Sequence, residues 1–206
     1  MGVEVVTIAM TIGARGVQIG RLVSEQVGFR YVNDEIIDRA AEHAGVSREV
    51  VAEVEHSPTL ISRMMNSVAA VMSSEGGYAV TPEEIDPSAS YRRLIQDVIR
   101  EVAAQGKAVI VAHGASILLA DRPGVLRVLI TASPATRVGR VARELGHDER
   151  QAAREIEHSD RERRAFFKRF YNLEAERETH YDLVINTDIL SPEVAARLIV
   201  HAVTNA

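Results

Sequence analysis

The chain has no cysteine and no tryptophan, and its only lysines are Lys107 and Lys168. The lack of cysteine excludes disulfide bonds, thiolate metal sites and a cysteine nucleophile. The sequence also lacks any apolar run near the ~20 residues that a membrane-spanning helix needs. Its beginning does not have the basic segment and cleavage pattern of a secretory signal. We therefore expect a cytoplasmic protein that does not insert into a membrane.

The chain also has fewer basic than acidic residues, with 24 lysines and arginines against 29 aspartates and glutamates. The formal net charge is −5, which gives no electrostatic reason to expect nucleic acid or an anionic membrane as a partner. The 7 histidines form neither an i,i+4 pair nor an H-E-x-x-H motif, so we expect no metal ion held by protein ligands. With 206 residues and 46% hydrophobic content, the chain can form one globular domain with a proper core.

Short apolar segments alternate with helical patterns along the chain. Segments rich in β-branched residues predict strands at Val5–Met10, Ala108–Ala112, Val125–Thr131 and Leu183–Asn186. Because helical patterns lie between them, the sequence predicts an α/β fold with a central parallel sheet covered on both faces.

Spacing and capping residues predict the helices. Asp34 is the expected N-cap of a helix at 35–43, Ser47 that of a helix at 48–55, and Ser191-Pro192 the start of the final helix. Further helices are expected at about 16–27, 58–72, 89–105, 134–146 and 149–172. Glycines and prolines predict a loop over 73–90. The apolar helix 58–72 is more typical of a core than of a cofactor site, and it also suits the surface of a homodimer.

The first strand and helix are joined by a turn rich in glycine. Gly13, Gly16 and Gly20 would let the backbone approach a phosphate and let the helix pack on the strand. The motif G-x-x-x-x-G-K-[ST] is not matched, since Gly16 stands at the lysine position and Val17 at the hydroxyl position. Arg15, on the turn, is the better placed substitute for that lysine charge. A tight turn without function explains the glycines about as well.

Four stretches of the chain together resemble the cytidylate kinase-like family of nucleoside monophosphate kinases. They are VTIAMTIGARGVQIGRLVSEQVG, YVNDEIIDRAAEHAG, GKAVIVAHGASILLADRPGVLRVLITASPATRVGRV, and IEHSDRERRAFFKRFY with YDLVINTDILSPEVAARLI. The last pair is the most specific. The resemblance implies a P-loop NTPase-like three-layer fold in a single domain, 1–206, with a helical monophosphate-binding insertion at about 34–105 and a lid at about 147–172.

The resemblance also implies an activity and a set of site residues. The activity is transfer of the γ-phosphate of ATP to a nucleoside monophosphate, with cytidylate as the expected acceptor and Mg²⁺ bound through substrate and water. The phosphates of ATP would be held by the loop residues Gly13, Ala14, Arg15, Gly16, Val17 and Gln18. The lid residues Arg163, Lys168 and Arg169 would act on the transferring phosphate, and Asp34, Arg39 and His113 would bind the acceptor.

Several positions depart from the family pattern and leave alternatives open. His113 stands where the family usually has an arginine, and Asn33-Asp34 replace a lone aspartate. Arg39 suits a surface role equally well, and the acidic residues between the lid cations also fit an ordinary salt-bridged helix. Two other functions therefore remain open: a non-catalytic module that binds a nucleotide or anion, and a kinase of another small acceptor.

Overall fold

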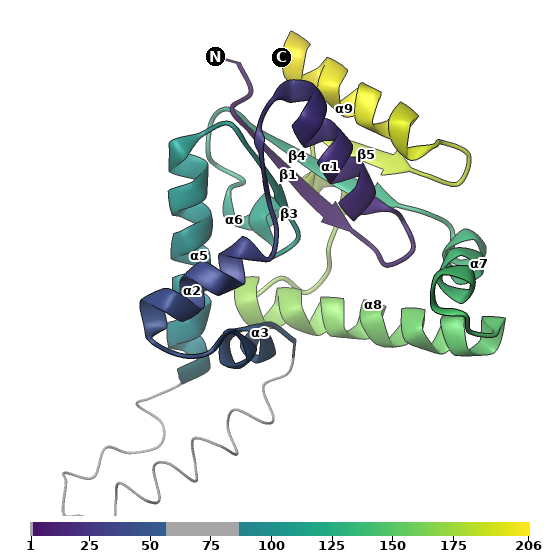
Figure 1. Cartoon of the computed structure of the whole chain (residues 1–206), viewed down its shortest axis with the longest axis horizontal. Helices are drawn as coiled ribbons and strands as arrows, with labels where there is room; N and C mark the ends of the chain where they lie inside the picture. The colour runs from purple at the N-terminus through teal and green to yellow at the C-terminus, as the bar shows by residue number, and fades with distance from the viewer. Residues whose placement is uncertain (1, 57–86) are drawn as a thin grey trace, which may run out of the picture. The chain divides into compact units, whose positions relative to one another are not determined.

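The structure, a computed structural model, describes residues 2–56 and 87–206. Its centre is a five-stranded parallel sheet with the strand order β2-β3-β1-β4-β5 (Figure 1). The strands are β1 (Val5–Met10), β2 (Arg30–Val32), β3 (Ala108–Val111), β4 (Val125–Thr131) and β5 (Leu183–Asn186). The predicted α/β fold with a parallel sheet is therefore confirmed.

Helices connect the strands. They are α1 (Gly16–Val27), α2 (Glu35–Ala44), α3 (Arg48–His56), α5 (Pro87–Gln105), α6 (Ala115–Leu118), α7 (Pro134–Leu145), α8 (Glu149–Tyr171), the 3₁₀ helix η2 (Glu178–His180) and α9 (Pro192–Asn205). Ser191 accepts a hydrogen bond from the Val194 N–H at 3.3 Å, with Pro192 in the first turn, which confirms the start predicted for the last helix. In α8 the helix begins at a capping box formed by Asp148 and Gln151.

Helices α1 and α9 lie together on one face of the sheet (Figure 1). Ile19 and Val23 of α1 and Ile199 of α9 pack against strand residues such as Ile8 and Val128, and all five side chains are buried. Burial of each such side chain contributes roughly 1.5–3 kcal/mol. This apolar layer fixes the helix that begins directly after the glycine turn.

The opposite face of β1 carries a polar contact. Thr7 alternates with Val6 and Ile8, so its side chain points away from α1. The hydroxyl groups of Thr7 and Ser116 lie 2.8 Å apart in a buried hydrogen bond, which ties α6 to the middle of the sheet. Strand β1 is thus held on both faces as well as by its two neighbouring strands.

The chain divides into two compact units. One comprises Met1–Asn33 and Arg100–Ala206 and contains the whole sheet, and the other is Asp34–Ile99. In the second unit, α2 and α3 are joined by an ion pair between Arg48 and Asp38 at 3.2 Å. Helix α5 starts in the second unit and ends in the first.

Four local predictions need correction. The three-residue strand β2 was not predicted, because Arg30–Val32 is too short to show an alternating pattern. Helix α5 begins at Pro87 rather than at about residue 89, since proline fits a first helical position. Strand β3 ends at Val111, because Ala112 adopts a positive φ of 68°. Asp34 precedes α2, yet its side chain makes no capping hydrogen bond and lies 3.6 Å from Arg48 instead. The predicted helix 58–72 falls outside the described residues.

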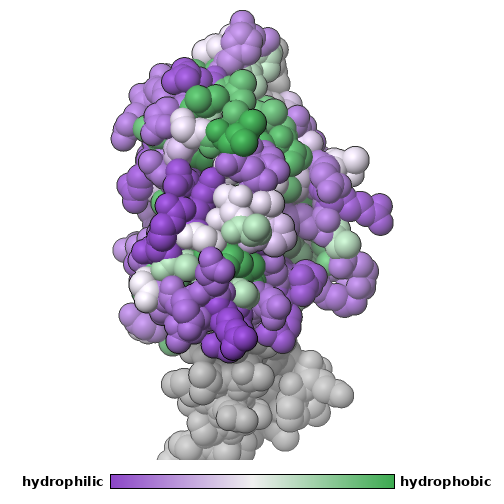
Figure 2. Space-filling view, turned by 90° about the vertical axis from the view of Figure 1, so that its right-hand side faces the viewer, coloured by the Kyte–Doolittle hydropathy of each residue, from purple (hydrophilic) through white to green (hydrophobic). Residues whose placement is uncertain are grey.

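The face of the molecule in Figure 2 is mostly hydrophilic, with an apolar area in its upper part. Large apolar side chains exposed among the described residues include Val184 on the edge strand β5 and Ile189 in the connection to α9. Within the described ranges, no helix is both long and apolar enough to span a bilayer.

Candidate phosphate-binding site

The turn between β1 and α1 depends on glycine for two reasons. Gly13 has a φ of +78°, and a Cβ atom there would lie 3.0 Å from the carbonyl oxygen of Arg137. Arg15, the residue before α1, also adopts the left-handed conformation, with φ 66°. The Ala14 N–H donates to the Thr11 carbonyl at 3.1 Å, which closes the turn. The predicted loop is thus a tight turn that ends at a helix N-terminus.

Side chains from distant segments bind the carbonyl oxygens of this turn. Arg137 and Arg140 come from α7, Arg163 comes from α8, and Thr187 follows β5. The pairs are Arg163 Nη1 to Met10 O at 2.9 Å, Arg137 Nε to Ile12 O at 2.8 Å, Arg140 Nη1 to Gly13 O at 3.1 Å and Thr187 Oγ1 to Ala14 O at 3.2 Å. We call these four side chains the carbonyl clamp.

The carbonyl clamp determines where the N–H groups of the turn point. In a planar trans peptide the carbonyl and the following N–H point in opposite directions. Because Arg137 holds the Ile12 carbonyl, the Gly13 N–H points the other way. The Thr187 hydroxyl shares its one hydrogen between Ala14 O at 3.2 Å and Thr131 O at 3.1 Å, and its contact with Ala14 O orients the following N–H, that of Arg15, in the same way. In the part of the chain that the structure describes, the N–H groups of Gly13, Arg15, Gly16 and Val17 have no hydrogen-bond acceptor.

These four N–H groups lie at the N-terminus of α1, where the helix dipole is positive. Free N–H groups gathered at such a position form a binding site for an anion, and phosphate is the common occupant. The lack of a side chain at Gly16 and Gly20 also serves packing. Added Cβ atoms would lie 2.6 Å from the Met10 side chain and 2.8 Å from Val111 Cγ2, so these glycines let α1 approach the sheet.

The arginines around the turn differ in their charge partners. Arg137 forms a bidentate ion pair with Asp160, with N–O distances of 2.9 and 2.6 Å. Arg140 is buried, with an exposed fraction of 6%, and donates to Thr187 Oγ1 at 2.9 Å and Thr187 O at 2.5 Å. Within the described segments it forms no ion pair, and burial together with the nearby charge of Arg15 lowers its pKa. Arg140 and Arg15 therefore give the turn a local positive potential in place of a lysine.

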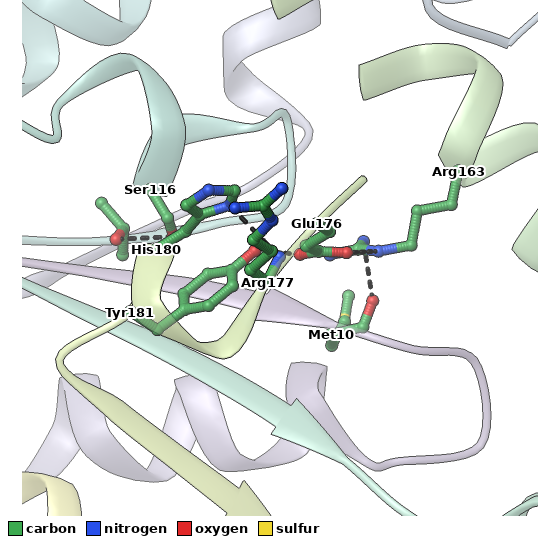
Figure 3. A network of polar contacts seen from close by, with 8 residues as sticks. Met10, Ser116, Arg163, Glu176, Arg177, His180 and Tyr181 are labelled. Atoms are coloured by element: carbon green, nitrogen blue, oxygen red, sulfur yellow. Dashed lines mark hydrogen bonds and ion pairs between the residues drawn. The ribbon is translucent and has the colours of Figure 1, made fainter. Parts of the chain in front are cut away.

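Arg163 forms the centre of a second polar network (Figure 3). Its guanidinium reaches from α8 to Glu176, with N–O distances of 2.8 and 2.6 Å, and contacts the Met10 carbonyl at the same time. The hydroxyl of Tyr181 also donates to Glu176. Burial and the Glu176 carboxylate raise the pKa of Tyr181 far above its ordinary value, so it stays a neutral donor. Burial by itself lowers the pKa of Arg163, but the hydrogen bond and charge of Glu176 outweigh burial, so the pKa is raised overall.

A small cavity of about 170 Å³ lies beside the end of β1. It is bounded by Thr11, by α8 and by the segment that follows α8, and its lining includes Asp160, Arg163 and Glu176. The hydroxyl oxygen of Thr11 is buried without a hydrogen-bond partner. This cavity reaches Thr11, at the start of the glycine turn, and provides room for part of a ligand beside the charged side chains of its lining.

His113 lies at the carboxyl end of β3, where a ligand site of a parallel sheet is expected. Its ring Nε2 is 3.1 Å from the Asn33 carbonyl, and the Tyr171 hydroxyl donates to the His113 carbonyl at 2.9 Å. A Cβ on Gly114 would lie 2.3 Å from the ring of Tyr171, so glycine is required here. His113 is thus buried, and both its ring and its carbonyl form hydrogen bonds within the protein. The arginine that the family usually has at this position would instead be presented to a phosphate.

The other predicted site residues make separate contacts within their own parts of the chain. Lys168 is exposed and pairs with Glu174, and the Arg169 guanidinium lies 5.5 Å from the centre of the Phe170 ring. Arg39 lies 3.9 Å from Glu35 within α2, in the second unit with Asp34. Ala14 is buried, whereas Val17 and Gln18 are exposed. The structure thus brings Arg163 to the predicted loop, while Lys168 and Arg169 contact other side chains.

Three clamp residues were not singled out from the sequence, namely Arg137, Arg140 and Thr187. The first two are separated by three positions in SPATRVGR, directly after a predicted strand and a strong helix start, and that spacing was the available signal. Among the described residues no cluster of three or more histidine, aspartate or glutamate side chains could hold a metal ion.

Comparison with solved structures defines the class of fold. An uncharacterized protein from Eubacterium ventriosum ATCC 27560 superimposes with a TM-score of 0.69 at 16% identity, covering 98% of this chain and 99% of that one. Shikimate kinase from Bacteroides thetaiotaomicron superimposes with a TM-score of 0.53 at 14% identity, covering 95% and 96%. The chain therefore has the fold of P-loop kinases.

The sequence identifies the family within this class. The sequence model of the cytidylate kinase-like family matches residues 5–189. The chain therefore belongs to the cytidylate kinase-like family, a family of kinase-like phosphotransferases. A cytidylate kinase of Aeropyrum pernix is 36% identical over 99 residues, a match that covers 48% of this chain and 57% of that relative.

Proposed function

We propose that this protein transfers the γ-phosphate of ATP to a nucleoside monophosphate, with cytidylate as the acceptor. The observation that carries the proposal is the set of free N–H groups at Gly13, Arg15, Gly16 and Val17. The carbonyl clamp orients the first two, and the last two lie in the first turn of α1, where helix N–H groups have no acceptor within the helix. ATP offers a chain of phosphate oxygens that matches such a set. The family membership and the name of the Aeropyrum pernix relative support cytidylate as acceptor.

Each group in this mechanism has a defined task. The N–H groups and the α1 terminus would hold the phosphates of ATP, and Arg15 and Arg140 would supply the charge that a lysine usually gives. Mg²⁺, held through phosphate oxygens and water, would neutralise charge on the β and γ phosphates. An oxygen of the acceptor phosphate would attack the γ-phosphorus directly while the bond to the bridging oxygen breaks and ADP leaves, so no protein nucleophile is needed. Arg163 would stabilise the moving phosphoryl group.

A substitution of Arg163 tests this assignment. In a phosphotransferase, an arginine that contacts the moving group contributes ~10³-fold or more to kcat. We expect Arg163→Ala to lower kcat by that order while KM for ATP changes much less, because the contact strengthens in the transition state. The measurement is transfer of labelled phosphate from ATP to CMP, UMP and AMP in the presence of Mg²⁺.

Arg150→Ala is the matched control, because Arg150 is exposed in the first turn of the same helix. We expect it to leave kcat within about threefold, less than 1 kcal/mol of barrier. Transfer to none of the monophosphates, with normal ATP binding, would contradict the proposal and favour the second candidate, a nucleotide-binding module without turnover. The pairing of Arg163 with Glu176 is the observation that favours that candidate.

A further inference from the structure

The segment 172–177, between α8 and η2, carries two glutamates that pair with lid cations. Glu176 pairs with Arg163, and Glu174 pairs with Lys168. Arg163 and Lys168 are the two residues that the family resemblance places over the transferring phosphate. One short segment therefore pairs with Arg163, which the proposed reaction requires, and with the neighbouring lid cation Lys168.

Side chains, rather than backbone bonds, hold the middle of this segment in place. Within the described part of the chain, Glu174, Ala175 and Glu176 make no backbone hydrogen bond. Glu176 is attached through Arg163 and the Tyr181 hydroxyl, and Glu174 through an exposed ion pair. A segment fastened in this way opens at lower free energy than one joined to a sheet or helix.

The space next to the segment suits an exchange of anions. The cavity of about 170 Å³ is lined by Glu174, Glu176 and Arg163, and it reaches Thr11 at the start of the glycine turn. Arg163 already contacts the Met10 carbonyl, one residue before Thr11. Arg163 thus contacts the backbone three residues before Gly13, the first of the free N–H groups. A dianionic phosphate that reached this guanidinium from the turn would be a stronger acceptor than the Glu176 carboxylate.

We propose that segment 172–177 is an internal competitor of the nucleotide phosphates, with the Glu176 carboxylate occupying Arg163 until a phosphate displaces it. This inference rests on the proposed function, because it assumes that phosphate binds at the turn. The apparent nucleotide affinity is then the intrinsic affinity multiplied by the fraction of molecules in which Arg163 is free of Glu176. The segment keeps the lid arginine from clamping other anions when no triphosphate is present.

Removal of the competing charge is the first test. Glu176→Gln keeps the size and one acceptor oxygen while removing the negative charge. We expect it to tighten ATP binding by ~10-fold, within the range typical of coupled equilibria, as measured by isothermal titration calorimetry. Glu178→Gln is the matched control, because Glu178 is exposed, lies two residues away and forms no ion pair in the described structure. It should leave ATP affinity within twofold.

Two further variants separate competition from a structural role. Tyr181→Phe removes the hydroxyl that holds Glu176, and we expect a tightening of ~3-fold, smaller because the Arg163 pair persists. This variant also carries the test if Glu176→Gln does not fold. In an Arg163→Ala background the gain in ATP affinity from Glu176→Gln should vanish, because the guanidinium for which Glu176 and phosphate compete is no longer present.

The outcomes distinguish the two proposals. Measurable ATP binding by the parent, with equal or weaker binding by both folded variants, would overturn the competitor and leave the proposed function standing. A gain from Glu176→Gln that persists without Arg163 would likewise overturn it. Absence of ATP binding in the parent and in every variant would overturn the proposed function and the competitor with it.

Discussion

At the residue scale, the turn obtains its positive charge from arginines that bind its carbonyl oxygens. A lysine in the loop would reach the phosphate directly, whereas Arg140 acts through Gly13 O and Thr187. Arg140 is buried and has no ion pair in the described structure. An anion bound nearby would therefore offset the free-energy cost of burying its positive charge. The loss of a lysine is therefore compatible with phosphate binding.

Substitution of Arg140 tests this at the same scale. Arg140→Met keeps the length of the side chain and leaves Gly13 O and both Thr187 oxygens without this donor. We expect a loss of about 1–3 kcal/mol in the free energy of unfolding, because buried acceptors become unsatisfied, and weaker ATP binding. Arg140→Lys should recover part of the ATP affinity through its charge but less of the stability, since lysine lacks the planar fork.

Arg143→Met provides the control, because Arg143 is exposed three positions further along α7 and bonds only within its own helix. Denaturant unfolding and ATP titration of the three variants give the comparison. Equal behaviour of Arg140→Met and Arg143→Met would show that the clamp does not depend on Arg140.

Single residues also mark the limit of sequence-based prediction. The glycine spacing predicted the turn, because only certain residues tolerate the φ of +78° at Gly13. The roles of Arg137 and Arg140 could not be predicted from the sequence, because these residues bind backbone oxygens that lie 125 and 127 residues earlier. A contact with a carbonyl oxygen imposes no residue type on its acceptor, so it leaves no paired pattern in the sequence.

At the element scale, one pair of residues fixes the register of the edge strand β5 on β4. The backbone N–H and the guanidinium of Arg127 donate to the Asp182 carboxylate at 2.6–3.0 Å, and the Asp182 N–H donates to the Arg127 carbonyl at 2.8 Å. These bonds lower the pKa of Asp182 from 3.8. Correct register brings Thr187 to the Ala14 carbonyl, so the pair supports the clamp.

The direction of this pKa shift predicts a pH dependence. A depressed folded-state pKa means that Asp182 stabilises the fold fully above its unfolded pKa, and this stabilisation is lost as the pH falls through the lower folded value. At pH 7 we expect Asp182→Asn to destabilise by about 0.5–1 kcal/mol, because the pair is partly exposed. Below a pH of about 4, near the ordinary aspartate pKa, the difference from the parent should shrink.

Thermal and urea unfolding at pH 7, 5, 4 and 3 measure the effect, with Glu25→Gln on the exposed face of α1 as the control. A difference between parent and Asp182→Asn that stays constant down to pH 3 would assign the effect to packing instead of charge.

Elements differed in how well the sequence predicted them. Strands β1, β4 and β5 were predicted with their observed bounds, because each is a short segment rich in apolar and β-branched residues. The helix after Ser191-Pro192 followed from its cap. Strand β2 has only three residues, and its pairing with β3 includes the Arg30 N–H donating to Lys107 O at 2.8 Å, a partner far along the chain.

At the scale of the whole molecule, the parallel sheet brings distant segments together at one turn. The strand order places β1 between β3 and β4, with β5 beyond β4. The helices that follow β4 and the residue that follows β5 therefore reach the carboxyl end of β1, where the free N–H groups lie. The family could be inferred from ordered motifs across the sequence, whereas the convergence of four clamp residues required the fold.

In the proposed function, backbone N–H groups bind the phosphates of the nucleotide without a lysine. The most direct measurement is the amide chemical shift of each residue by ¹⁵N–¹H NMR during titration with ATP and Mg²⁺. We expect the largest shifts at Gly13, Arg15, Gly16 and Val17, in the direction of stronger hydrogen bonding. Saturable binding of ATP with unchanged amide signals at these four residues would contradict this proposal.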